Sequence, residues 1–422
     1  MVFLCRRLIE GCVSIIKKNM VASLDIGTSS IKAALAEVTP GREINILGIS
    51  QVTSSGLRKG NIVDIEGTAK AIDHCLNELE RLTGVAIYNT LVGFSGISIN
   101  TVNNHAVVSV GNPSYEITRD DKERVLQSAC NISLPPDKTL LQVIERQYIV
   151  DGYEGVKDPV GMVGNRLETE VSIITAASAA IQNMQRSTAR INLQVDYLVY
   201  NPLLLSESVL LPAEKEMGVV LIDFGAGITE ITLFEGGSML HSSVLPVGDE
   251  YITRDLAIVL KTSIEEADRI KQQYGVASPE LLGQDSMVAI KNVQGKEIKQ
   301  VSQQVIADIV NARVIEIIAM ILTEIKNHIS PEGIPGGIVL SGGGTELSGL
   351  VDVMEEHLNT SVRIGLPENL RGLPTEFNRP QNAVVLGGVM FAAQNSRTVY
   401  YEDKGFTGIF HKMNYWLRDL FS

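Results

Sequence analysis

Cysteine is scarce in this sequence, and the few cysteines show neither a metal-binding nor a disulfide pattern. The four are Cys5, Cys12, Cys75 and Cys130; none are paired as C-x-x-C, and only six histidines accompany them. This composition argues against a zinc site and against a disulfide framework, and it favours a reducing compartment.

Positive charge and long apolar runs are also lacking. Lys and Arg number 36 against 49 Asp and Glu, a net charge of −13, and no long basic run occurs. We therefore expect no nucleic-acid partner, because neutralising phosphates requires clustered cations. No stretch reaches the ~20 uninterrupted apolar residues that a membrane-spanning helix needs. Arg6 and Arg7 interrupt the first apolar run and no small-residue cleavage site follows, so residues 1–20 are interpreted as an N-terminal extension and not as a secretory signal.

What is present is a globular composition over a length that predicts two or more domains. The chain has 422 residues, 45% of them apolar and 20% charged. From residue 21 short apolar runs alternate with amphipathic segments, as in α/β proteins. Strands are predicted at 21–24, 31–38, 44–52, 91–99, 168–175, 195–199, 218–222 and 337–340, and helices at 68–83, 118–130, 179–191, 262–274, 302–329 and 346–358. The stretch 101–167 holds one charged helix and a turn-rich segment, which predicts a small insertion.

An internal repeat carries most of the functional signal. The run from Ala22, ASLDIGTSSIKAAL, recurs in outline from Val220 as VLIDFGAGITEITL, so that Asp25 aligns with Asp223 and Gly27 with Gly225. Each copy is a buried strand ending in Asp, a turn of small residues and a second apolar strand. Small residues let backbone N–H groups approach phosphate oxygens, and a strand-end Asp can hold a water of Mg²⁺. One such turn is common, but two in matched context predict a phosphate site.

A third motif places three glycines after a strand, in Ile338-Val-Leu-Ser-Gly-Gly-Gly-Thr-Glu-Leu. We predict that a helix N-terminus follows these glycines, which would make a seat for an anion or nucleotide. The sequence contains no G-x-x-x-x-G-K-[ST] and no G-x-G-x-x-G after a strand, so neither a P-loop nor a dinucleotide-binding fold is supported.

Together these motifs resemble the superfamily of actin, Hsp70 and sugar kinases, and within it the FtsA family of bacterial cell-division actin homologues. The resemblance implies an actin-like ATPase fold with two duplicated ribonuclease-H-like halves, a nucleotide cleft, ATP and Mg²⁺. It assigns to ATP binding Gly27, Thr28, Ser29, Lys32, Gly225, Ala226, Gly227, Thr229, Gly342, Gly343 and Gly344, with Glu266 and Lys271 of the segment that closes over the base. Asp25 and Asp223 are the implied Mg²⁺ ligands, through water.

The same resemblance implies a division of the chain into subdomains. The first actin-like subdomain would comprise 21–100 and 168–213, with 101–167 inserted and available to other division proteins. The second would comprise 214–246 and 330–394, with a partner-binding subdomain at 247–329. A linker at 395–405 would lead to a membrane-targeting helix at 406–422.

Two positions depart from the superfamily pattern. Ala226 stands where a third glycine is frequent, and it can crowd one backbone donor. Asn201 stands where hydrolytic relatives often carry Glu or Gln, and an amide can orient a water but cannot act as a general base. Asp25, Asp223 and Asn201 are thus the candidate catalytic groups, and we predict slow or undetectable ATP hydrolysis.

The C-terminal residues 406–422 predict an amphipathic helix about 24 Å long. Its apolar stripe consists of Phe406, Ile409, Phe410, Met413, Trp416, Leu417, Leu420 and Phe421. The polar linker before it and its position at the chain end favour a membrane or partner surface, with Lys412 and Arg418 toward anionic lipid. The FtsA resemblance implies a peripheral anchor on the cytoplasmic face of the cell membrane. A helix docked on the protein's own core is the alternative.

The resemblance also implies partners. The subdomain at 247–329 would bind the C-terminal peptide of FtsZ, the tubulin-like division protein, with Arg313 and Asn311 as contacts, and the chain would form head-to-tail polymers. The implied function is an ATP-binding protein that anchors the FtsZ ring at the division site. The rival interpretations are a PilM-like scaffold of type IV pilus assembly, which shares the fold, and a small-molecule kinase. A kinase would require a carboxylate base in a substrate pocket, and no motif supplies one.

Overall fold

The computed structural model describes residues 19–39, 41–111, 114–283, 285–295, 297–328 and 334–395. The expected N-terminal extension up to residue 18, all of the linker beyond residue 395 and the expected helix at 406–422 lie outside these residues. Among the described helices, none is both long and apolar enough to cross a bilayer.

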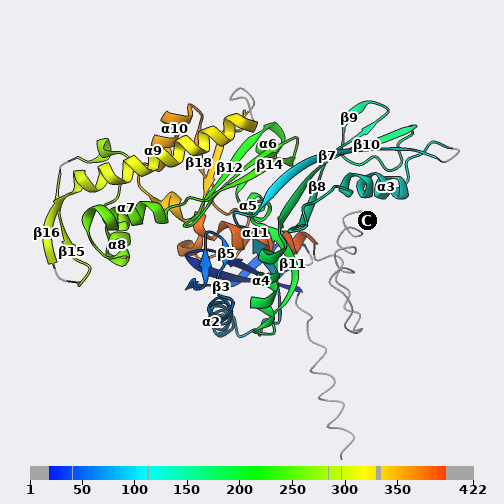
Figure 1. Cartoon of the computed structure of the whole chain (residues 1–422). Coiled ribbons are helices and arrows are strands. Elements are labelled where there is room, and N and C mark those ends of the chain that lie inside the picture. The colour runs from blue at the N-terminus through cyan, green and yellow to red at the C-terminus, as the bar shows by residue number, and fades with distance from the viewer. Residues whose placement is uncertain are drawn as a thin grey trace, which may run out of the picture.

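Two five-stranded sheets with the same strand order form the two halves of the molecule (Figure 1). The strand order of the first sheet is β11(Gln194–Tyr200), β6(Asn89–Phe94), β1(Asn19–Ile26), β2(Ser30–Val38) and β3(Ile44–Thr53). The corresponding order of the second sheet is β18(Val362–Ile364), β17(Ile338–Ser341), β12(Val219–Phe224), β13(Thr229–Glu235) and β14(Ser238–Leu245). In each, the first three strands in sequence form an antiparallel meander, and the next strand pairs in parallel with the first. The repeat in sequence is therefore a repeat in topology.

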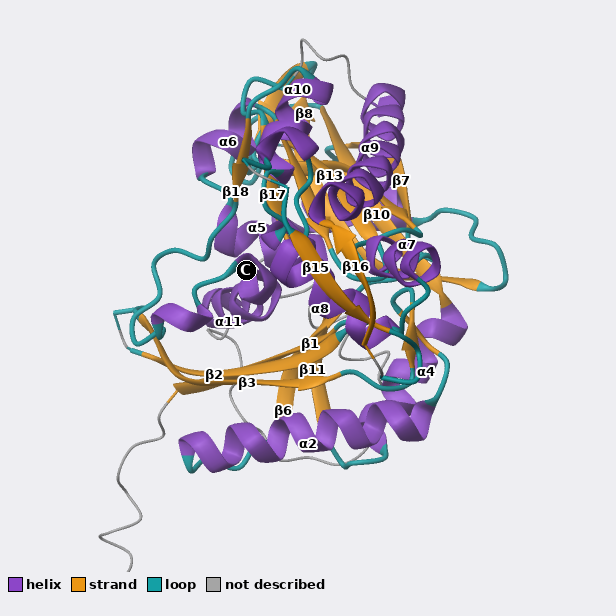
Figure 2. Cartoon of the chain, turned by 90° about the vertical axis from the view of Figure 1, so that its left-hand side faces the viewer, coloured by secondary structure: helices purple, strands orange, loops and turns teal. Residues whose placement is uncertain are grey.

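Helix α2(Ile65–Thr83) covers the outer face of the first sheet (Figure 2). Asp64 caps it by accepting a hydrogen bond from the N–H of Glu66, and Gly84 ends it at φ 70°. Ile72 and Leu79 are fully buried against the sheet, and each contributes roughly 1.5–3 kcal/mol. The cap explains why the helix begins three residues before the predicted start at residue 68.

Helices α5(Asn201–Val209) and α11(Ala383–Asn395) lie between the two sheets and join the halves (Figure 2). Their backbones approach closely: a Cβ atom added to Gly387 would lie 1.8 Å from the carbonyl oxygen of Leu204. Helix α11 is buried over most of its circumference, so its sequence has no apolar–polar period, and periodicity did not predict it.

The inserted subdomain is a four-stranded antiparallel sheet backed by one helix. Its strand order is β7(Asn100–Ser109), β10(Arg166–Ala177), β8(Lys138–Val150) and β9(Tyr153–Val156), and α3(Arg119–Cys130) packs on β7 and β10. The predicted helix is confirmed, with Thr118 as its cap. The boundary expected at residue 167 falls inside β10, which pairs with β7 and β8 as far as Thr175, so 168–175 belongs to the inserted sheet.

The subdomain expected at 247–329 projects from the opposite side of the molecule (Figure 1). It comprises α7(Glu250–Leu260), α8(Ile264–Tyr274), the hairpin β15(Met287–Lys291)–β16(Glu297–Ser302) and α9(Gln303–His328). Gly295 adopts a φ of 79° in the turn between the two strands of this hairpin. The C-terminal part of α9 continues onto the second sheet, where it contacts β13 and β14.

Candidate functional site

The two Asp-bearing turns have the same local geometry. In the first, Asp25 pairs with Lys32 across β1 and β2, and the Gly27 N–H donates to the Ser30 carbonyl at 3.1 Å. In the second, Asp223 pairs with Glu230 across β12 and β13, and the Gly225 N–H donates to Ile228 at 3.1 Å. The sequence repeat thus corresponds to two superimposable hairpins, one opening each half.

Both turns line one cavity of about 550 Å³ between the halves. A Cβ atom added to Gly227 would lie 2.8 Å from the Thr28 Oγ1 atom, so the tips of the two turns are in contact. Thr28 Oγ1 in turn accepts a hydrogen bond of 3.0 Å from the Gly60 N–H. Asp25 and Asp223 therefore face the same space from opposite sides, as the repeat predicts.

Acidic groups dominate the electrostatics of this cavity. Lys32 Nζ lies 3.7 Å from Asp25 Oδ2, and both side chains are buried. Burial raises the pKa of Asp25, although the Lys32 ammonium opposes this shift. Burial, and then the nearby Asp25 charge, raises the pKa of Asp223 to about 6. Burial and the Asp223 charge raise the pKa of Glu230 well above its usual range.

The lining of the cavity carries fewer cationic than acidic side chains. Asp25, Asp223 and Glu230 face it with Lys32 and Lys271 as the lining cations, and Lys271 is already bound to Asp249 and Asp268. Carboxylate oxygens and water are the ligands that Mg²⁺ prefers. The donor set therefore fits a divalent cation held by Asp25 and Asp223.

The third motif lies at the same cavity, but its geometry differs from the prediction. Gly342, Gly343 and Gly344 all line the space, yet no α-helix begins at them. Residues 343–346 form a single 3₁₀ turn, and α10(Leu350–Leu358) starts only after Gly349. Added Cβ atoms at Gly342 and Gly344 would meet Asp223 Oδ1 at 2.3 Å and the Phe224 ring at 2.5 Å. These two glycines are thus required by close approach to β12.

Most of the other predicted residues reach the cavity, and two do not. Ser29, Ala226 and Lys271 line it. Thr229 is fully buried and donates its hydroxyl hydrogen to the Val247 carbonyl at 2.8 Å. Glu266 forms a two-point ion pair with Arg269 and accepts from the Lys291 N–H. The structure therefore places Thr229 and Glu266 away from the cavity lining.

Asn201 is the first residue of α5 and is 8% exposed at the floor of the cavity. Its Oδ1 atom is buried without a hydrogen-bond partner among the described residues. A Cβ atom at Gly93, which pairs with Asp25 across β6 and β1, would lie 2.4 Å from that oxygen. A glycine is needed there because the Asn201 amide oxygen packs directly against its backbone.

Glu230 is the lining residue that the sequence analysis missed. It is 3% exposed on β13. The repeat contained the signal, because Glu230 follows Asp223 by the same interval as Lys32 follows Asp25. The alignment therefore places a carboxylate in the second half where the first half has an ammonium group.

The residues expected to bind a partner peptide lie on α9 and are engaged internally. Arg313 donates to both carboxylate oxygens of Asp255, at 2.5 and 3.1 Å, and to Glu316 at 2.6 Å. Its guanidinium also lies 5.8 Å from the ring centroid of Tyr251. The Asn311 side chain donates to the Ala277 carbonyl at 2.7 Å. Both side chains are therefore held in place.

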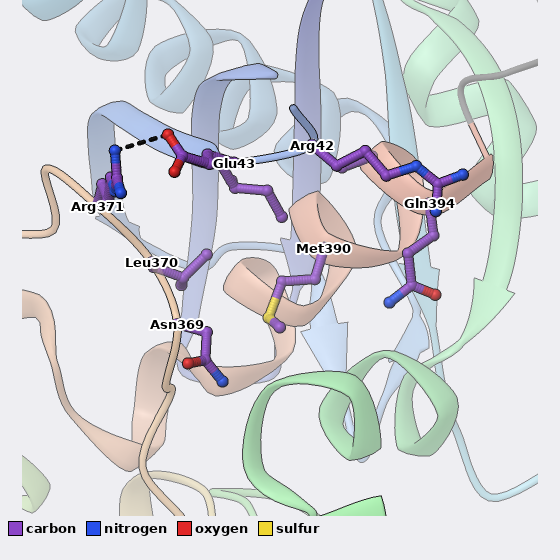
Figure 3. Close-up of a pocket in the computed structure, with 9 residues that line it drawn as sticks. Arg42, Glu43, Asn369, Leu370, Arg371, Met390 and Gln394 are labelled. Carbon is purple, nitrogen blue, oxygen red and sulfur yellow. Dashed lines mark hydrogen bonds and ion pairs between the residues drawn. The ribbon is translucent and has the colours of Figure 1, made fainter. Parts of the chain in front are cut away.

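A second hollow, of about 500 Å³, lies between the start of β3 and α11 (Figure 3). Arg42, Glu43, Leu370, Arg371 and Met390 line it, and Arg371 Nη1 pairs with Glu43 Oε2 at 2.6 Å. It contains none of the residues expected to bind nucleotide, so the candidate site is the cavity between the halves.

Two duplicated sheets around a cavity lined by paired acidic turns define the actin-like ATPase fold. Solved structures share it at low identity: a PilM–PilN type IV pilus biogenesis complex (TM-score 0.63, 16% identity, 88% of this chain and 98% of that one) and MreB5 of Spiroplasma citri bound to AMPPNP (0.56, 12%, 90% and 98%). Family models match "Cell division protein FtsA" at residues 220–387 and "SHS2 domain inserted in FTSA" at 96–175.

Relatives that match over most of their own length show which family the chain belongs to. FtsA of Neisseria meningitidis is 34% identical over 96% of this chain and 99% of its own, and FtsA of Bacillus subtilis is 35% identical over 90% and 84%. The chain belongs to the FtsA family of cell-division proteins, which are actin homologues. The PilM-like alternative corresponds to a likeness of fold alone, at 16% identity.

Proposed function

We propose that this protein binds ATP in the cavity between its halves and anchors the FtsZ ring to the cytoplasmic face of the cell membrane at the division site. The observation that carries the proposal is the contact of the two Asp-bearing turns, Thr28 against Gly227, over a single cavity. A phosphate chain placed there would receive backbone N–H donors from both halves, so binding favours one relative position of the halves.

Each group at the cavity has a role in this proposal. Lys32 and the turn N–H groups contact phosphate oxygens, and Asp25 and Asp223 hold Mg²⁺ through its water ligands. The metal, when bound, neutralises charge on the phosphates. Gly343 lies against the adenosine: the nearest atom to a Cβ added there would be Gln381 Cβ at 3.9 Å, which leaves room for a ligand. That MreB5 was solved with AMPPNP supports the choice of an adenine nucleotide.

Slow hydrolysis follows from Asn201. An amide side chain can orient a water by hydrogen bonding but cannot remove a proton at neutral pH. Burial and the Asp223 charge raise the pKa of Glu230, which disfavours the ionised form that a general base requires. ATP acts mainly as a conformational ligand in this proposal.

Nucleotide binding is tested by titrating the full chain with ATP, with and without Mg²⁺, in a calorimeter. Lys32→Met should weaken binding at least tenfold, because a charge-assisted contact contributes about 1.5–3 kcal/mol. Lys70→Met, on the exposed face of α2, is the matched control and should bind normally. Equal ATP affinity of both variants and wild type would remove the cavity from the proposal, and rapid phosphate release would contradict slow turnover.

The FtsZ contact is tested by a charge swap at Arg313. Arg313→Asp should abolish binding of the FtsZ C-terminal peptide in a fluorescence anisotropy assay, while ATP binding persists. Adding Asp255→Arg restores the internal ion pair. Peptide binding that stays lost in the swapped protein supports direct recognition by Arg313; binding that returns, or that was never lost, contradicts it.

A further inference from the structure

Three side chains of metal-ligating type meet where α9 ends on the second sheet. Glu324 and His328 lie one turn apart on α9, and His241 lies on the edge strand β14. One ligand atom from each residue lies within 4.8 Å of the other two. Figure 1 shows α9 crossing the molecule toward β14, where its C-terminal end lies.

The distances approach those of a tetrahedral metal site. Glu324 Oε1 lies 3.3 Å from His328 Nε2 and 3.8 Å from His241 Nε2. Ligand atoms about 2.0–2.1 Å from a tetrahedral ion are roughly 3.3 Å apart. The spacing of the carboxylate from both imidazoles therefore needs little change to admit an ion.

One of these nitrogens has nothing to bind in the protein. His241 Nε2 is buried and has no hydrogen-bond partner among the described residues, and its 3.8 Å distance from Glu324 is too long for a hydrogen bond. A buried polar atom without a partner loses free energy on folding. An ion at the centre of the cluster would use this lone pair.

The two imidazole rings stack, with centroids 3.5 Å apart and planes 20° apart. Stacked rings direct their lone pairs side by side, so a shared ion requires one ring to turn. His328 is the ring that can turn, because its side chain is 39% exposed at the end of the helix, whereas His241 is 21% exposed.

We infer that His241, Glu324 and His328 form a binding site for a borderline divalent ion of the Zn²⁺ class. Two imidazoles and one carboxylate suit Zn²⁺, and they do not suit Mg²⁺, which prefers six oxygen ligands. Three protein ligands leave the fourth position to water. The sequence argument against zinc relied on cysteine spacing and could not detect this site, since His241 is distant in sequence from the other two residues.

A bound ion would tie α9 to the strand that supports the inserted subdomain. The Ser242 carbonyl, next to His241, accepts from Thr101 Oγ1 at 2.8 Å, and the Met239 carbonyl accepts from Ser172 Oγ at 2.9 Å. The site therefore lies beside the joint between the second half and the insertion. It is separate from the nucleotide cavity and does not depend on the proposed function.

The test is Zn²⁺ binding to the full chain without nucleotide, measured by competition with a chromophoric chelator. We expect one Zn²⁺ per chain, and His241→Ala or His328→Ala should weaken binding by more than the roughly 10–100-fold that loss of an outer-shell partner costs. His357→Ala, a histidine on α10 bonded to the Val353 carbonyl, is the control and should bind as wild type.

A second readout keeps the test independent of folding defects in the variant of the half-buried His241. Zn²⁺ should raise the melting temperature of wild type and of His357→Ala but not that of His328→Ala, whose side chain is partly exposed. Wild type that binds no Zn²⁺ against the chelator overturns the inference. So does Zn²⁺ binding that is equal in wild type and in the two His variants, since the ion would then lie elsewhere.

Discussion

At the scale of single residues, the cavity between the halves is built at the expense of stability. Asp25, Asp223 and Glu230 are buried within one another's electrostatic field, and the pKa of each is raised above its usual value. A protein selected only for stability would not place three carboxyl groups there. The arrangement is useful if a cation and a phosphate chain enter the cavity and complete its charge.

The Asp223 carboxyl predicts a pH-dependent stability change in Asp223→Asn. Its pKa is about 6 in the folded protein and 3.8 ordinarily, so ionisation destabilises the fold; the penalty is absent below about pH 4, grows through this window and is complete above about pH 6. A pKa difference of this size corresponds to roughly 2–3 kcal/mol. The ligand-free Asn variant should therefore melt at a higher temperature than wild type at pH 8.

That advantage should shrink toward pH 4, and the variant should lose Mg²⁺-dependent ATP binding at every pH. Differential scanning calorimetry in Mg²⁺-free buffers measures the first effect. The exposed Asp73→Asn on α2 should show neither effect. A variant that is less stable than wild type at pH 8 would show that the carboxylate is stabilised in the folded protein and not strained.

Substitutions at Gly227 and Thr28, where the two turns meet, should have coupled effects on stability. A methyl group at Gly227 would lie 2.8 Å from Thr28 Oγ1 and 2.9 Å from its Cγ2, which is closer than packing allows. Gly227→Ala should lower stability by about 1–3 kcal/mol, as overpacking does, and weaken ATP binding. Thr28→Ala in the same chain removes both clashing atoms, so the double variant should melt above Gly227→Ala; independent, additive losses would refute the contact.

The sequence predicted the positions that are shared by the repeat and failed at those that depend on side-chain direction. Asp25, Asp223 and the glycines could be located because two copies of one pattern fixed their place on a turn. Thr229 lies in the same run, yet its hydroxyl bonds Val247 of the following loop, which no local pattern reports. Glu230 could have been found, since the position seven residues after each Asp faces the cavity in both copies.

At the scale of elements, periodicity succeeded where one face of an element is exposed. Helices α2 and α3 were predicted because their buried residues recur on one side and their caps, Asp64 and Thr118, are local. Helix α11 was missed because it is buried nearly all round. Strand β10 was assigned to the wrong sheet, because partner choice is decided by β7 and β8, which pair with it from distant parts of the sequence.

Two adjacent glycines of α11 are predicted to respond differently when the Ser23 side chain is shortened. A Cβ atom at Gly387 would meet the backbone carbonyl of Leu204 in α5 at 1.8 Å, whereas one at Gly388 would meet the Ser23 Oγ atom at 2.0 Å. Both Ala variants should destabilise the protein by about 1–3 kcal/mol or more. Ser23→Ala removes the clashing oxygen, which is buried and has no hydrogen-bond partner in the described part of the chain, so it should restore much of the stability lost in Gly388→Ala.

The same Ser23→Ala change should leave Gly387→Ala unchanged, because a backbone clash between α5 and α11 has no side chain to remove. Chemical-denaturation midpoints of the four variants measure both effects. Equal rescue of the two glycine variants, or of neither, would contradict the helix crossing described here.

At the scale of the whole molecule, the fold couples the cavity to the joint between its halves. The two Asp-bearing turns that line the cavity belong to different sheets, and α5 and α11 pack together between those sheets. Asn201, at the floor of the cavity, is also the first residue of α5. A ligand that draws the turns together would therefore act on the same helices that set the relative position of the halves. Such a change would alter how successive subunits pack in the head-to-tail polymer that the family resemblance implies.

This coupling predicts that membrane binding depends on both ATP and residues 406–422. A single amphipathic helix anchors weakly, and many anchors on one polymer bind by avidity. The full chain should therefore co-sediment with vesicles rich in anionic lipid, more with Mg²⁺-ATP than without, and a chain ending at residue 405 should stay in the supernatant under both conditions.

Trp416→Glu, in the middle of the apolar stripe, should behave as the truncation does, whereas Asn414→Glu on the polar side, which adds the same charge, should retain most of the binding. Equal sedimentation of the truncated and full chains would show that the anchor lies elsewhere. Membrane binding that requires residues 406–422 but is unchanged by ATP would show that the anchor is not coupled to the cavity.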